Sequence, residues 1–395
     1  MAVATETSTA TIQVKWWYWP LLLAVPATGV LWVLNRQVGS VQGELTVPLF
    51  FVAALALIPL ATMIGDATES AAAYVGPVAG GLLNATFSNV PELAIGLFLL
   101  LDAHQRANVP GTVASDHEVI RGLLIGSVIN NILLVLGVSI FLAALRHGRM
   151  NFSKEGAAGY ASMLALAVVG LALPTLASGF AADNVAGVDR VSLLVGLVLV
   201  LSYVAYIGAT VFHWRENPPG EKRLDQFADP RAVRDRSGLV LAFSLFGILT
   251  LLTVGIAFVL VDTTDKAITN TPLTPLSVGL IIFPILCNVG ELAGVLEGAM
   301  KNNMEQAMAV AGGSAVQVPL LVAPILIAVA YLTSGGDSAQ LLPLVFQPLL
   351  LIVVGLVTFV YALVSLDGET TWLEGLQLVA FYAMIAVTAL ALPGR

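Results

Sequence analysis

The sequence predicts an all-α polytopic membrane protein of about 11 transmembrane helices, built as two inverted five-helix repeats preceded by one extra N-terminal helix. Three observations support this fold class: the composition, the spacing of the apolar segments and a polar motif that occurs twice. Of the 395 residues, 58% are hydrophobic and 11% are charged, and the mean hydropathy is +0.91. Soluble domains carry about 25% charged residues. We therefore expect the chain to lie in a lipid bilayer, and nothing in it predicts contact with nucleic acid.

Eleven apolar segments supply the helices, most of them close to the roughly 20 residues that cross a bilayer. The first opens with four aromatic residues, Trp16–Trp19, which is typical of a membrane interface. It is also longer than the apolar region of a cleavable signal peptide. The segments are residues 16–34, 47–65, 77–101, 122–145, 157–176, 191–213, 237–261, 276–300, 304–333, 341–365 and 371–392.

A charged connection divides the chain near its middle. Residues 214–236 contain six of the Lys and Arg residues as well as Pro and Gly, and we interpret them as a cytoplasmic linker. The linker separates a first five-helix repeat, 47–213, from a second, 237–395, and residues 1–46 hold the extra helix. Because five is odd, the second repeat must insert upside down relative to the first, as in many secondary transporters.

The loop charges predict the orientation. If the segments alternate across the bilayer, 11 of the 17 Lys and Arg residues lie on the side of the N-terminus. Positive charge in short loops marks the cytoplasmic side. We therefore expect the N-terminus and the linker to be cytoplasmic and the C-terminus to lie on the opposite side. The plasma membrane of a prokaryote and the membrane of an acidic organelle both fit this orientation.

A short polar motif occurs once in each half. The first half has Asn89-Val-Pro-Glu92 and the second has Asn288-Val-Gly-Glu291. The spacing of three residues places each Asn and Glu on one helix face. An ionisable side chain inside a membrane span marks a functional site by default. The alternative reading, a buried protonated carboxyl with a structural role, is disfavoured because the motif is repeated.

Each motif is followed, one segment later, by a second polar helix. The first half has Gly126-Ser-Val-Ile-Asn-Asn131 and the second has Gly313-Ser-Ala-Val-Gln317. Gly126 and Gly313 are expected to let helices approach closely. The candidate site residues on these helices are Ser127, Asn130, Asn131, Ser314 and Gln317. Ser and Asn in membrane spans also bond neighbouring helices, and for Ser127, Asn130 and Ser314 that reading stays open.

These residue types form a set of hard oxygen ligands, which is what Ca²⁺ prefers. The predicted metal ligands are Glu92, Glu291, Asn89 and Asn288. We expect Pro91 to release the backbone carbonyl of Phe87, with Gly290 as a weaker helix breaker at the matching position. Pro319 is expected to act similarly in the ninth segment. Two nearby carboxylates in a low-dielectric cavity cannot both stay ionised while the site is empty.

Other ionisable residues are interpreted as peripheral. The four histidines, among them His117, fall in connections or at segment ends, which argues against a histidine metal centre at mid-membrane. Asp116 and Glu118 are read as loop charges. Glu297 is read as a carboxylate of the vestibule rather than a ligand. No Gly-rich phosphate loop is present, so we expect no nucleotide and no other cofactor.

On these motifs the chain resembles the cation/proton exchanger family of the calcium/cation antiporter superfamily. Residues 80–93 and 126–137 resemble its first repeat, and residues 283–305 and 313–324 resemble its second. The resemblance implies antiport of Ca²⁺ and protons, with Glu92 and Glu291 as the shared site. It also implies that Asn89, Asn288, Asn131, Ser314 and Gln317 match family site residues. By analogy with the superfamily, the backbone carbonyls of Ser88 and Cys287 would face the ion.

The chain departs from the family pattern at four positions, and three other functions compete. Ser88 and Cys287 replace Gly, Asn130 replaces Ser, and Leu292 replaces a His that would titrate beside the site.

A Na⁺/Ca²⁺ exchanger is the first alternative function, although Val318 stands where such exchangers tend to carry Asp. A cation channel is the second. An enzyme is not expected because no nucleophile or metal triad can be assembled. No oligomeric state is predicted.

Overall fold

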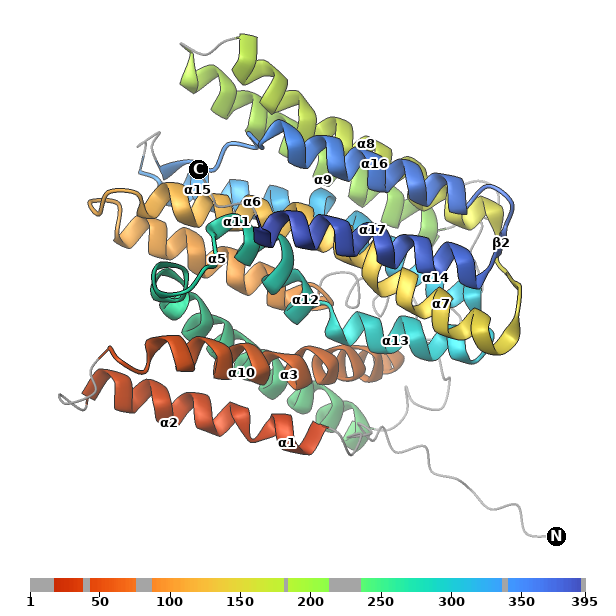
Figure 1. The fold of residues 1–395 in the computed structure, drawn as a ribbon, viewed down its shortest axis with the longest axis horizontal. Coiled ribbons are helices and arrows are strands. Elements are labelled where there is room, and N and C mark those ends of the chain that lie inside the picture. Colours follow the sequence, from red (N-terminus) through yellow and green to blue (C-terminus); the bar gives the residue numbers. More distant parts are fainter. Residues whose placement is uncertain are drawn as a thin grey trace.

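The structure, a computed structural model, is helical almost throughout the residues that it describes: 18–37, 43–75, 87–180, 184–212, 236–335 and 340–391 (Figure 1). The N-terminal half contains the helices α1 (Tyr18–Leu22), α2 (Ala24–Gln37), α3 (Thr46–Val75), α5 (Val90–Gln105), α6 (Thr112–Ile129), α7 (Leu136–His147), α8 (Lys154–Phe180) and α9 (Val185–Phe212). The C-terminal half contains α10 (Arg236–Asn270), α11 (Pro275–Ser277), α12 (Phe283–Cys287), α13 (Val289–Met300), α14 (Met304–Gln317), α15 (Ala323–Thr333), α16 (Pro348–Val364) and α17 (Trp372–Ala391). Two short strands, β1 (Met150–Asn151) and β2 (Glu369–Thr370), pair antiparallel.

The helices have the length and composition of membrane spans. Seven helices in the described part of the chain are long and apolar enough to cross a bilayer. An eighth span is obtained if the pair Pro275–Cys287 and Val289–Met300, which is bent by 52°, counts as one. The expected class, an all-α multi-pass integral membrane protein, is therefore confirmed.

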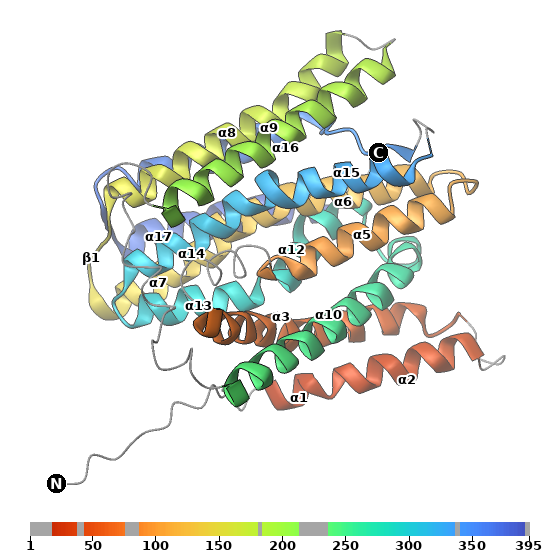
Figure 2. The same cartoon turned by 180° about the vertical axis from the view of Figure 1, so that it is seen from behind.

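The helices form three layers (Figures 1 and 2). An outer layer holds α1, α2, α3 and α10, and α3 packs along α10. A central layer holds α5, α6, α7 and α11 to α15, together with α17. A second outer layer holds α8, α9 and α16 on the opposite side of the centre. Both repeated motifs lie in the central layer, covered on each side by apolar helices.

Glycines allow the backbones of the central layer to meet. A Cβ at Gly122 would lie 2.9 Å from the backbone nitrogen of Leu280, and one at Gly126 would collide with the Leu280 carbonyl. The close approach expected at Gly126 is therefore present. The expectation for Gly313 is wrong: its nearest neighbour is an ordinary contact with Tyr160 at 3.8 Å. Gly312 is the tightly packed glycine instead, because a Cβ there would lie 2.7 Å from the Tyr361 hydroxyl oxygen.

Three wide π-helical turns interrupt the central helices. They are η1 (Asn130–Val135) between α6 and α7, η5 (Val278–Ile282) between α11 and α12, and η6 (Val318–Val322) between α14 and α15. The irregularity expected at Pro319 is the π turn η6, in which this proline occupies the first turn. π turns occur frequently at functional sites because they redirect side chains within a helix.

Some expectations concern residues outside the described part of the chain, and others are corrected by the structure. The linker 214–235 and the start of the first motif, residues 80–86, lie outside the described residues. Asp116 and Glu118 are not loop charges: they lie within α6, which begins at Thr112. His117 lies on the same helix and is buried rather than in a connection. The apolar pattern starts later than the helix, because these polar residues occupy its first two turns.

Candidate functional site

The two motifs have the same backbone geometry. Asn89 precedes α5 with φ −98° and ψ 22°, and Asn288 precedes α13 with φ −93° and ψ 9°. Each Asn carbonyl accepts a hydrogen bond from the backbone N–H four residues later, at 3.0 Å and 2.9 Å. Glu92 and Glu291 therefore occupy equivalent places in the first turn of their helices.

The causes of the two breaks differ from the expectation. Pro91 does not kink a continuous helix; the turn at Ser88 and Asn89 makes the break, and Pro91 fits the first turn of α5, where no N–H is needed. Gly290 is not primarily a helix breaker. A Cβ at Gly290 would lie 2.5 Å from the carbonyl oxygen of Ala61, so this glycine lets α13 touch the backbone of α3.

The structure joins the first motif to the polar helix of the second half. The Asn89 side-chain amide donates to Gln317 Oε1 at 2.6 Å, and the Ser88 hydroxyl donates to the same oxygen at 3.1 Å. Asn89 and Gln317, which are 228 positions apart in the sequence, thus contribute to one site. From the sequence, only the backbone carbonyl of Ser88 is expected to face the ion. Its hydroxyl, present because Ser replaces the usual Gly, adds a contact that this expectation missed.

The second motif faces the polar helix of the first half. The side chains of Asn131 and Ser314 lie next to the Glu291 carboxylate, although no hydrogen bond of standard geometry forms. Glu92 and Glu291 are close enough to interact electrostatically. Cys287 is buried and interacts with both carboxylates. Two acidic groups from separate halves therefore share one interior site.

Several oxygens of this site have no hydrogen-bond partner. The buried, unpartnered oxygens are Asn89 Oδ1, Glu92 Oε2, Ser127 Oγ, Asn130 Oδ1, Asn131 Oδ1, Asn288 Oδ1 and both carboxylate oxygens of Glu291. A buried polar atom without a partner costs about 1–3 kcal/mol. So many oxygens in one place are suited to a cation, and Ca²⁺ takes 6–8 oxygen ligands in flexible geometry.

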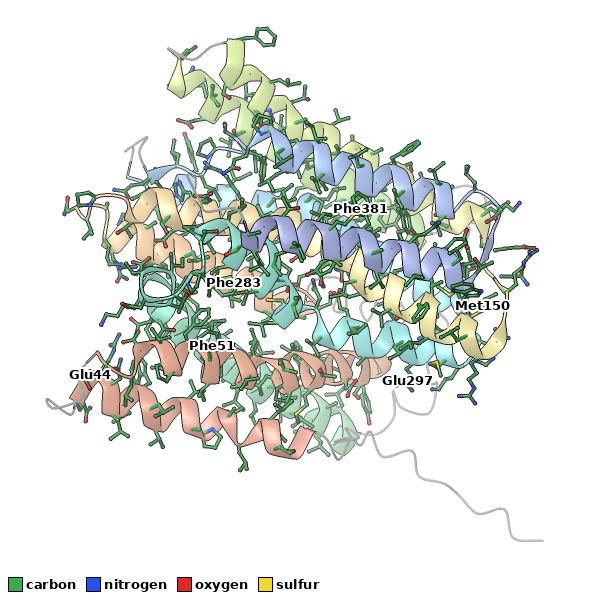
Figure 3. The ribbon with its side chains drawn as sticks, viewed as in Figure 1. Glu44, Phe51, Met150, Phe283, Glu297 and Phe381 are labelled. Carbon is green, nitrogen blue, oxygen red and sulfur yellow. The ribbon has the colours of Figure 1, made fainter. Side chains whose placement is uncertain are left out.

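The predicted residues do not all behave alike. Ser127 is fully buried and its hydroxyl has no partner, which speaks against a simple helix–helix bond. Asn130, by contrast, donates to the carbonyl of Pro284 at 3.4 Å, a contact between helices that sequence reasoning had left open. Glu297 pairs with Lys301 at 2.7 Å toward the far end of α13 from the break (Figure 3). Within the described residues, no three His, Cys, Asp and Glu side chains gather at one metal-binding point.

Comparisons with known proteins give matches over most of the chain. The model of the family "Sodium/calcium exchanger protein" matches residues 45–212 and 241–391. A Ca²⁺/H⁺ antiporter from Synechocystis sp. is 34% identical over 360 residues, covering 87% of this chain and 91% of the relative. The Ca²⁺/H⁺ antiporter ChaA of Bacillus subtilis is 32% identical and is covered over 94% of its length. The solved structure of native YfkE is 27% identical, with a TM-score of 0.75, covering 95% of this chain and 100% of that one.

Proposed function

Since the chain belongs to the sodium/calcium exchanger protein family, we propose that it is a secondary transporter that exchanges Ca²⁺ for protons by alternating access. One observation carries the proposal. Glu92 and Glu291, from two separate halves, share an interior site in which several buried oxygens have no hydrogen-bond partner. The relatives named Ca²⁺/H⁺ antiporter match over most of this chain.

The charge of the site explains why exchange is coupled. A site with two ionised carboxylates and no bound cation is expensive to bury in a low-dielectric interior. Either one Ca²⁺ or protons on both carboxyl groups neutralise it. The transporter therefore changes conformation with Ca²⁺ bound or with protons bound, while the empty dianion is held back. Both ions compete for the oxygens of Glu92 and Glu291, so movement of one requires release of the other.

The ligands of Ca²⁺ would come from both halves. We assign the carboxylates of Glu92 and Glu291 and the amide oxygens of Asn89 and Asn288 as the metal ligands. The side chains that complete or position this set are those of Asn130, Asn131, Ser127, Ser314 and Gln317. The backbone carbonyls of Phe87, Ser88 and Cys287 are further candidates. Ca²⁺ and protons are the transported ions, and the proposal includes no resident cofactor and no enzymatic step.

The coupling ion is the main alternative. Val318 is fully buried and apolar where Na⁺-coupled exchangers of the superfamily tend to carry Asp. This position supports protons as the coupling ion. A cation channel would keep the site but would need no occluded state. Saturable Ca²⁺ flux that is coupled to protons would distinguish the exchanger from such a channel.

We further propose a fold of about eleven transmembrane helices with two inverted repeats, and the reciprocal packing of the two halves supports the inverted arrangement. The first helices of the halves, α3 and α10, pack together, as do the fourth helices, α8 and α16. The third helix of each half packs on the fifth of the other: α7 on α17, and α15 on α9. The second helix of each half, α5 or α13, packs on the first of the other. Such exchange of partners is what a two-fold axis in the membrane plane produces. The two family matches, 45–212 and 241–391, lie close to the proposed halves 47–213 and 237–395.

The experiment that tests the function is Ca²⁺ uptake into proteoliposomes. Uptake is measured under an imposed pH gradient, and then under a Na⁺ gradient of matched size without a pH gradient. The proposal expects uptake with the pH gradient alone. Uptake driven only by Na⁺ would transfer the chain to the sodium-coupled alternative, and flux independent of both gradients would support a channel.

A further inference from the structure

A charged cluster lies away from the binding site, where α5 ends and α6 begins. It combines residues of three helices: Arg106 at the end of α5, Asp116 in α6 and Asp265 in α10. Arg106 Nη1 lies 2.5 Å from Asp265 Oδ2, while Arg106 Nε donates to Asp102 Oδ1 at 2.9 Å. The guanidinium is thus held by its own helix on one side and reaches α10 on the other.

The Arg106–Asp265 pair links two different layers. Arg106 belongs to the central layer that carries the binding site, whereas α10 belongs to the outer layer of α1, α2 and α3. Figure 2 shows α10 running beside α5, and the two helices are in contact. One turn earlier on α10, Asp262 pairs with Arg36 of α2 at 2.9 Å. That second pair stays inside the outer layer, so it serves as an internal comparison.

Asp116 is a further acidic side chain beside this ion pair. It is 2% exposed, its Oδ2 has no hydrogen-bond partner, and it interacts electrostatically with both Asp265 and Arg106. Arg106 therefore faces three acidic side chains, those of Asp102, Asp116 and Asp265. Loss of Arg106 removes the ion pair that joins α5 of the central layer to Asp265 of the outer layer.

Buried apolar residues separate this cluster from the site along α5 and α6. Asp116 and Ser127 are 11 residues apart on α6, which is three helical turns or about 16 Å on one face. Ile120 and Leu123 lie between them and are fully buried. On α5, Leu99 and Ala103 are likewise buried below Arg106. These turns of α5 and α6 are therefore closed to solvent.

We propose that the Arg106–Asp265 ion pair, with Asp116 beneath it, is a latch that holds the binding site closed toward the membrane face at which α5 ends. Opening toward that face separates α10 from α5 and α6 and breaks the pair. Arg106 and Asp265 lie away from the site that binds Ca²⁺ and protons. They therefore act as positioning residues that set the balance between the conformations closed and open toward this face. This inference rests on the proposed alternating access.

The test measures the apparent affinity for Ca²⁺ on each face of the membrane separately. Proteoliposomes of known orientation carry the wild type, Arg106→Gln, Asp265→Asn or the charge swap Arg106→Asp with Asp265→Arg. Weakening the latch populates the conformation open to its face, so KM for Ca²⁺ should fall on that face and rise on the other. A partly exposed ion pair contributes up to about 1 kcal/mol, so each change should be about two- to five-fold.

Two controls separate a latch from a merely structural contact. Arg36→Gln removes the neighbouring pair within the outer layer and should leave KM on both faces unchanged. The charge swap should return both KM values toward the wild type. The latch would be overturned by any of three results: KM changes equally on both faces, KM stays unchanged in both single variants, or Arg36→Gln changes KM in the same way as they do. If Arg106→Gln does not fold, Asp265→Asn, which retains the charge of Arg106, decides the question. Absence of proton-driven exchange by the wild type in the same vesicles would instead overturn the proposed function.

Discussion

At the level of single residues, each of the two repeated motifs contributes one acidic side chain to the site, Glu92 from the first and Glu291 from the second. Neither Glu92 Oε2 nor either oxygen of Glu291 has a hydrogen-bond donor, although these atoms are buried. Carboxylates in this condition are stabilised by a bound cation or by protonation. The energetics of the site therefore depend on which ion occupies it, which is the requirement for exchange.

Removing one of these carboxylates should abolish exchange. Glu92→Gln and Glu291→Gln keep the side-chain shape but remove the charge that Ca²⁺ and protons share. With one carboxylate removed, the charge of a buried Ca²⁺ is no longer fully compensated, at a cost of about 3–5 kcal/mol, so we expect Ca²⁺ uptake to fall by more than about 100-fold. The measurement is uptake driven by a pH gradient, with size-exclusion chromatography to show that the variants fold. Glu297→Gln, on the same helix but paired with Lys301, is the matched control and should retain uptake. Sustained uptake by either site variant would contradict the assignment.

Gln317 should control affinity rather than turnover. Its Oε1 accepts from both Asn89 and Ser88, so it holds the first motif in place. In Gln317→Ala the Asn89 amide loses this acceptor, at a cost of about 1–3 kcal/mol, and KM for Ca²⁺ should rise by about 5- to 100-fold. Gln347→Ala, which removes an exposed bond to Glu118, is the control and should leave KM unchanged. An unchanged KM in Gln317→Ala would show that Gln317 does not position the site.

At the level of elements, the sequence predicts more of the site than of the helices that build it. The motifs Asn89–Glu92 and Asn288–Glu291 and their partner helices could be paired from their repetition, and the structure places them together; their role as ligands stays a prediction. The π turns could not be anticipated, because hydropathy does not distinguish a wide turn from an ordinary one. The beginning of α6 was missed because Asp116, His117 and Glu118 look like loop residues, although tertiary contacts bury the first two.

The contact between α13 and α3 depends on a single glycine. Gly290→Ala would place a Cβ 2.5 Å from the Ala61 carbonyl oxygen, so α13 must move away from α3 and shift Glu291 with it. Overpacking of this kind costs about 1–3 kcal/mol. We expect a lower unfolding temperature in detergent and reduced Ca²⁺ uptake. Gly294→Ala is one turn further along the same helix and is exposed, so it should behave like the wild type. Equal stability of the two variants would mean that α13 does not rely on this contact.

At the level of the whole molecule, the reciprocal packing of the halves relates the binding site to the mode of transport. The site is built from the second and third helices of both halves, while α3 and α10 pair in an outer layer that contacts α5 and α13. If the outer layer moves against the central one, the same site can open to either face without being rebuilt. The ion pair between Arg106 and Asp265 is one place where such a movement would be resisted.

Inverted repeats make a specific prediction about membrane sidedness. The loop after α5 and the loop after α13 are equivalent in the two halves, so inversion places them on opposite faces. A cysteine is introduced at Asn108 in the first loop or at Lys301 in the second, in separate variants expressed in a bacterial plasma membrane. The single native cysteine, Cys287, is buried, so the parent chain should give little background. A membrane-impermeant maleimide should label Asn108→Cys in intact cells and Lys301→Cys only after permeabilisation. Labelling of both from one face would exclude the inversion, whereas a swapped result would keep the inversion and reverse the orientation inferred from loop charges.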